Sequence, residues 1–326
     1  MRKNIIQGVL GGVLVLALVF LAVGPSLADS LGVSFESPTY ITGTVNGQDG
    51  WTSLGSEGSG CAVYDHAVVT NTYGILSFED QSLRISNAFT SGCFGDQTFA
   101  KPLTDSVGEV DATVGSFSEG TRQRHFEMQF DIASTSSGVQ PGLFVSVSPD
   151  RGDGSRMSYL GFKDTEDGID IIFYDVQGTD NPANFVPTEL GTFSRATPHT
   201  IKLTMDTLDG PSNDKVKVWI DGNLEHTGTS WENYYRHDNE ASAEQSPRIV
   251  KTVIFRTGGP AAPDTVGNGY LFDNLTLLSG PIPVGPPSNK NECKAGGWMA
   301  FNSPPFKNQG ACVSYVQSNE NAGKRD

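Results

Sequence analysis

Apolar and polar residues alternate in short runs through the central part of this chain. In the clearest run, 125–132, Phe126, Met128, Phe130 and Ile132 fall on one side, and polar residues fall between them. A period of two residues is that of a β-strand with one buried and one exposed face. The run 215–220 has the same pattern, with Val216, Val218 and Ile220 on one face and Lys217 and Trp219 on the other.

Comparable runs predict further strands at 143–147, 158–163, 169–176, 200–206, 249–256 and 270–278. Asp-Gly pairs at 167–168 and 221–222 predict hairpin turns, because both residues of such a turn must accept a positive φ. No ten-residue segment outside the N-terminal region shows a helical period. We therefore expect residues 29–280 to form one all-β domain, an antiparallel β-sandwich of the jelly-roll type.

The first 28 residues have the pattern of a signal peptide. Arg2 and Lys3 precede the apolar stretch 5–23, and Ser26 and Ala28 place small residues at the positions that signal peptidase requires. The alternative is an uncleaved anchor, but the stretch is short for a membrane-spanning helix, which needs about 20 residues. We expect cleavage after Ala28, export to the extracellular space or cell surface, and no stable membrane insertion afterwards.

The C-terminal part differs in composition. Four prolines in 281–291 predict a semi-extended linker, followed by a small cysteine-paired module at 292–317 and a disordered polar tail at 318–326. The net charge of −15 argues against nucleic acid as a partner.

An even number of cysteines in an exported chain indicates disulfides. The spacing suggests the pairs Cys61–Cys93 and Cys293–Cys312, although the other pairings of these four residues stay open. A zinc site is not indicated, because the sequence has no CxxC motif, that is, no two cysteines with two residues between them.

Three motifs resemble known families. Phe35-Glu36 with GQDGW at 47–51, together with GYLFDNL at 269–275, is similar to secreted bacterial jelly rolls of the concanavalin A-like superfamily, which includes laminin-G and carbohydrate-binding modules. The resemblance implies that the first and last strands lie side by side, and that Glu36 and Asp273 help to hold a structural calcium ion. The segment 293–316, with CKAGGW and FKNQGACV, resembles a tail of exported bacterial proteins that has no established function.

Aromatic residues in the region 219–236 are candidates for binding a sugar. Sugar rings stack on tryptophan and tyrosine, while polar side chains hydrogen-bond the hydroxyls. The candidate ligand-binding residues are Trp219, Trp231, Tyr234, Tyr235 and Arg236. For Trp219, packing in the core is the main alternative.

The candidates for catalysis are Glu127 and Asp131, in a strand similar to the ExDxxE or ExDxE strand of sandwich glycoside hydrolases. Here Gln129 replaces the central acid, and no segment typical of a polysaccharide lyase is present. We therefore expect a secreted, non-catalytic protein that binds an extracellular polysaccharide or glycoconjugate. A structural or adhesive surface protein is one alternative, and a divergent polysaccharide hydrolase or lyase is another.

Overall fold

The computed structural model describes residues 29–54, 65–89, 96–104, 124–152, 154–179, 183–208, 212–238, 250–257 and 260–322. The signal peptide and the Cys61–Cys93 pair therefore lie outside the described residues and stay predictions. In the part of the chain that is described, none of the helices combines the length and apolar character needed to cross a membrane.

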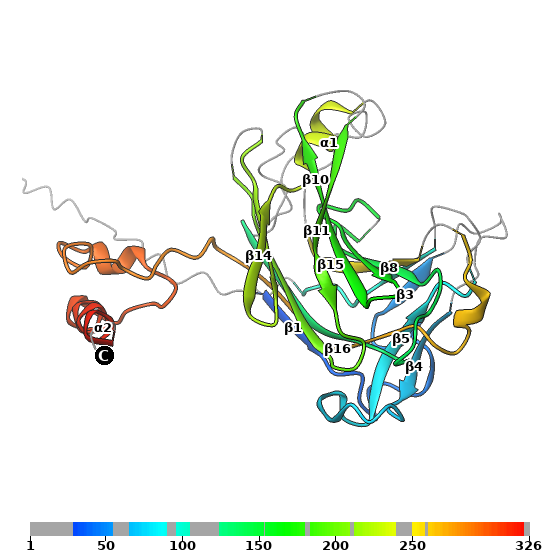
Figure 1. Ribbon diagram of the computed structural model, residues 1–326. Helices are drawn as coiled ribbons and strands as arrows, with labels where there is room; N and C mark the ends of the chain where they lie inside the picture. Colours follow the sequence, from blue (N-terminus) through cyan, green and yellow to red (C-terminus); the bar gives the residue numbers. More distant parts are fainter. Residues whose placement is uncertain are drawn as a thin grey trace, which may run out of the picture.

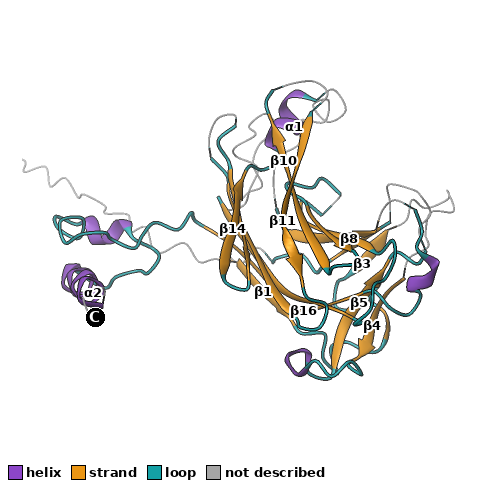
Figure 2. Cartoon of the chain, viewed as in Figure 1, coloured by secondary structure: helices purple, strands orange, loops and turns teal. Residues whose placement is uncertain are grey.

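The domain consists of two antiparallel sheets packed face to face (Figures 1 and 2). Sheet A contains, in spatial order, β14 (Asn223–Gly228), β13 (Lys215–Ile220), β12 (His199–Asp206), β7 (His125–Ser134), β16 (Tyr270–Gly280), β5 (Gln81–Ser86), β4 (Asp65–Thr70) and β2 (Gly43–Thr44), and β1 (Asp29–Val33) also pairs with β16. Sheet B contains β11 (Asn184–Phe193), β10 (Ile169–Gln177), β9 (Leu160–Asp164), β8 (Phe144–Asp150), β15 (Thr252–Thr257), β6 (Gln97–Phe99) and β3 (Thr52–Leu54). The predicted jelly-roll sandwich is confirmed.

The predicted strands are all present, with ends shifted by a few residues. The turn at Asp221-Gly222 has φ values of 52° and 81° and joins β13 to β14. Strand β1 pairs with β16, from Asp29 opposite Ser279 to Val33 opposite Leu275, as the resemblance implied. Strands β2 to β6 and β11 were not predicted. In β11 most side chains are exposed and Pro187 interrupts the pattern.

The core lies between the two sheets and is rich in aromatic rings. The residues predicted to face inward on β7 are buried, and the ring of Phe130 contacts that of Phe272 with 5.7 Å between their centroids. Phe255 of sheet B packs edge-to-face on Phe272 of sheet A at 5.0 Å, which joins the two sheets. Trp51 is buried against Phe255 at 5.8 Å.

Helices are few, but one of them contradicts the sequence analysis. The C-terminal module contains the 14-residue helix α2 (Gln309–Ala322). The last five residues of this helix fall within 318–326, for which the sequence predicted a disordered tail, so that prediction is wrong for these five residues. The helix has a weak helical pattern, and within residues 309–318 Val316 and the disulfide partner Cys312 are buried. The predicted Cys293–Cys312 disulfide is present. Figure 1 shows this module apart from the sandwich, at the end of the linker.

The remaining helical segments are short. They are α1 (Glu232–His237) and the 3-10 turns η1 (Leu76–Phe78), η2 (Pro263–Thr265) and η3 (Gly297–Ala300).

The backbone is closely packed around Gly269, which precedes β16. Its φ is +119°, and a Cβ there would lie 2.2 Å from the carbonyl oxygen of Ile85. Gly267 also has a positive φ, +74°, but a Cβ there would meet nothing within 4 Å. We predict that Gly269→Ala lowers the free energy of unfolding by about 3 kcal/mol, and that Gly267→Ala costs clearly less. Denaturant unfolding measures both, and equal losses would contradict the packing described here.

Candidate functional site

The outer face of sheet A gathers several of the candidate residues. Lys202 lies opposite Gln129 on one side and opposite Trp219 on the other, so these three side chains form one row across β7, β12 and β13. A hollow of about 350 Å³ opens here, lined by Gln129, Thr200, Lys202, Trp219 and Gly222. We call this surface the sheet A face.

Trp219 is half-buried on this face and does not belong to the core. The ammonium group of Lys202 lies 5.7 Å from the centre of the Trp219 ring and 2.7 Å from Oε2 of Glu127. Glu127 and Trp219 therefore emerge on the same side of the same sheet. Because the lysine and the glutamate neutralise each other, the hollow beside Trp219 is polar with little net charge.

The two candidate catalytic carboxylates have different partners. Glu127 pairs with Lys202, whereas Asp131 accepts hydrogen bonds from the hydroxyl of Thr200 at 2.6 Å and from the amide of Asn274 at 2.9 Å.

The other aromatic candidates lie elsewhere in the molecule. Trp231 is only 7% exposed, and its Nε1 donates to the carbonyl of Tyr174 at 2.9 Å. Tyr235 is buried and donates its hydroxyl to the carbonyl of Arg156 at 2.9 Å. The structure thus places Trp231 and Tyr235 as packing residues where α1 meets β10.

Arg236 and Tyr234, the two remaining candidates for ligand binding, also contact other residues of the protein. Arg236 forms an ion pair with Glu232 one helical turn earlier, at 2.9 Å. Tyr234 is half-buried, and its ring lies 5.5 Å from that of Phe185 on β11. The sequence predicts a polar loop in this region. The aromatic residues are packed instead, because their partners come from the distant strands β10 and β11 of sheet B.

The two predicted calcium ligands lie in one acidic corner. Asp273 is buried at the bulge of β16, and burial raises its pKa from 3.8 to about 8. The backbone N–H of Asn274 opposes this rise, and the negative charges of Glu36, Asp131 and Glu79 add to it. The fold therefore brings four carboxyl groups into electrostatic contact at this corner.

Glu36 is oriented by backbone donors in the same corner. Its Oε1 accepts hydrogen bonds from the N–H groups of Asp80 and Gln81, at 3.1 and 2.9 Å. Among the described residues, no three acidic, histidine or cysteine side chains converge tightly enough to form a metal site. A calcium ion here would draw further oxygen ligands from backbone carbonyls and water.

Searches of protein-family models and of curated proteins find no match to this sequence. Solved structures with a related arrangement include the globular domain of T. cruzi calreticulin, 10% identical, with a TM-score of 0.41 over 86% of this chain and 99% of that chain. Alginate lyase PA1167 from Pseudomonas aeruginosa is 11% identical, with a TM-score of 0.35 over 61% and 82%. The binding domain of botulinum neurotoxin DC is 10% identical, with a TM-score of 0.36 over 67% and 43%. A likeness this remote assigns the chain neither a ligand nor a reaction.

The buried carboxyl of Asp273 predicts a dependence of stability on pH. Because its pKa is raised on folding, the native state keeps a proton that the unfolded chain releases, so Asp273 makes the fold less stable as pH rises from about 4 to 8. Asp273→Asn keeps an acceptor for the N–H of Asn274 and removes this effect. We expect the melting temperature of the variant to exceed that of the parent increasingly between pH 4 and 8. Parallel curves over this range would contradict the assignment.

Proposed function

We propose that this protein is secreted and binds an extracellular glycan without catalysis, and that it holds an uncharged sugar unit on the sheet A face. The observation that carries the proposal is the half-exposed ring of Trp219 beside a hollow lined by an amide and a hydroxyl.

The chemistry of this face suits a neutral sugar. The ring of Trp219 offers an apolar surface for the C–H face of a pyranose. Gln129 can both donate to and accept from sugar hydroxyls, and Thr200 lies beside it with its hydroxyl directed to Asp131. Because Lys202 is neutralised by Glu127, a charged ligand gains little here.

Catalysis is not part of the proposal, because Gln129 replaces the central acid of the hydrolase strand and Glu127 is paired with Lys202. A structural or adhesive role is compatible with glycan binding if the C-terminal module attaches the protein to a surface.

We further propose a structural calcium ion at the acidic corner, held by Glu36 and Asp273. The support is that the negative charges of Glu36, Asp131 and Glu79 all act on the buried carboxyl of Asp273, and a divalent cation would oppose them.

Removing the Trp219 ring tests the glycan proposal. We expect Trp219→Ala to weaken binding of the best neutral polysaccharide on a glycan array by about tenfold, and Trp219→Phe to keep most of it. The matched control is Phe185→Ala, which removes a partly exposed ring from sheet B. If no neutral glycan binds, or if Trp219→Ala binds as well as the parent, the proposal is wrong.

Calcium binding is tested by thermal unfolding with added calcium and then with a chelator. We expect calcium to raise the melting temperature, because a ligand that binds only the native state stabilises it. Glu36→Gln keeps the acceptor for the backbone donors and should abolish the calcium effect. An equal melting temperature with calcium and with chelator would exclude the site.

A further inference from the structure

The row of side chains on the sheet A face continues across further strands on both sides. Beyond Trp219 it reaches Leu224 of β14, which lies directly opposite. Beyond Gln129 it reaches Thr276 of β16 and then Gly32 of β1. Residues directly opposite each other on neighbouring strands share one face of the sheet. We call this set the cross-strand row; its members, in order, are Leu224, Trp219, Lys202, Gln129, Thr276 and Gly32.

The cross-strand row is an outer surface along its whole length. Leu224 is 52% exposed, Thr276 and Gly32 are also exposed, and the other members are half-buried. The residues on either side of Thr276 along β16 are buried in the core instead. Neighbouring strands lie about 4.8 Å apart, so the steps from β14 to β1 together span roughly 24 Å. The hollow beside Trp219 therefore occupies only part of a longer surface.

Three members of the row have hydrogen-bonding groups that the protein does not use. The indole N–H of Trp219, the side-chain amide of Gln129 and the hydroxyl of Thr276 have no partner among the described residues. They come from β13, β7 and β16, so they are spaced along the row. A sugar hydroxyl both donates and accepts, so each of these groups can bond to one.

Charged side chains lie on both sides of the row but are matched within it. Two residues further along the same strands, and on the same face, are Lys217 and Glu127 on one side and Asp131 on the other. Lys202, the charged member of the row, is paired with Glu127 at 2.7 Å. Covering a charged group with a neutral ligand costs desolvation free energy. An uncharged chain is therefore favoured across the strands, along the row, over a path along one strand.

Gly32 leaves the β1 end of the row open. It lies inside β1 and pairs with Thr276 without a bulge, and its φ is outside the left-handed region. A Cβ there would meet nothing within 4 Å. Neither the backbone nor the packing of the protein therefore requires glycine here. A glycine within a strand weakens it, and it often marks a place where a ligand approaches the backbone closely.

From this arrangement we propose that the cross-strand row binds an extended, uncharged polysaccharide chain that runs across the strands. The inference rests on the function proposed for the sheet A face and names the class of its ligand, a linear β-1,4-linked chain of neutral pyranoses. The chain covers about five sugar units, one for each step of about 4.8 Å between strands. Its first unit packs on Trp219 and Leu224. Its middle units bond to Gln129 and Thr276, and its last unit passes over Gly32.

The class of linkage follows from the spacing of the strands. A β-1,4-linked chain of such sugars is an extended ribbon, in which each unit adds a length close to the distance between neighbouring strands. An α-1,4-linked glucan winds into a helix instead. A ribbon stays in contact with a row across several strands, whereas a helix leaves it after a short stretch.

The test is calorimetric titration of the full protein with β-1,4-linked oligosaccharides of glucose, mannose and xylose, each as the disaccharide and the hexasaccharide. We expect the hexasaccharide of the best series to bind at least about tenfold more tightly than its disaccharide. The α-1,4-linked glucose hexasaccharide should show no such gain over its own disaccharide.

Gly32→Glu tests the far end of the row, because a long charged side chain there lies over the path of the ligand. We expect this variant to lose the gain of the hexasaccharide and to bind the disaccharide as the parent does. The matched control is Ser30→Glu, which adds the same charge at an exposed position on the same face of β1, outside the row. The control should keep the gain. Far-UV circular dichroism of both variants checks that the fold is intact.

The outcomes separate failure of the extended site from failure of the sugar site at Trp219. Equal binding of disaccharide and hexasaccharide, or parental binding of the hexasaccharide by Gly32→Glu, would overturn the extended site alone. Equal losses in Gly32→Glu and Ser30→Glu would also overturn it, because they would show a general effect of charge. If no neutral oligosaccharide binds, this inference fails together with the proposed function.

Discussion

The structure depends on the pairing of its two last strands with strands from much earlier in the chain. In sheet A, β16 lies between β7 and β5, and in sheet B, β15 lies between β8 and β6. Until these strands are in place, the early strands of each sheet are not connected to the later ones. Their side chains also join the two sheets, since Phe255 of β15 packs on Phe272 of β16. These pairings join segments that are far apart in the sequence, and they hold the two halves of each sheet together.

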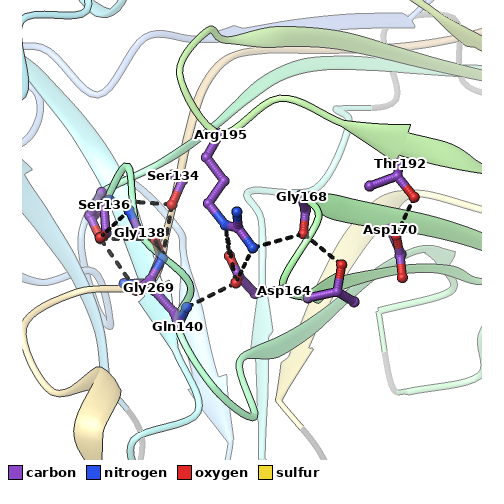
Figure 3. A network of polar contacts seen from close by, with 12 residues as sticks. Ser134, Ser136, Gly138, Gln140, Asp164, Gly168, Asp170, Thr192, Arg195 and Gly269 are labelled. Atoms are coloured by element: carbon purple, nitrogen blue, oxygen red, sulfur yellow. Dashed lines mark hydrogen bonds and ion pairs between the residues drawn. The ribbon is translucent and has the colours of Figure 1, made fainter.

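The sheet A face and the acidic corner depend on that closure. The acidic corner lies at the bulge of β16, where the charge of Glu36 from the first part of the chain acts on Asp273. Gly269, at the entrance to β16, exchanges two hydrogen bonds with the amide of Gln140 before β8 (Figure 3). The sheet A face is supported from the other side, because Asn274 of β16 fixes Asp131.

On the sheet A face, opposite charges and an apolar ring lie close together. Lys202 is matched by Glu127, and the half-buried ring of Trp219 lies in the same hollow as the neutral polar groups of Gln129 and Thr200.

The sequence by itself determined what depends on local pattern. The period of two residues gave the strands and the inward side chains of β7 and β13, and Asp221-Gly222 gave a hairpin, because both effects arise within a few residues. Tertiary structure alone decided which outward side chains are neighbours, because strand pairing joins distant segments. It placed Gln129 and Trp219 on either side of Lys202, and it buried Trp231 against β10. Helix α2 was not predicted, because its helical pattern is weak. It is held in its module by the disulfide from Cys312 to Cys293, a contact between residues that are distant in the sequence.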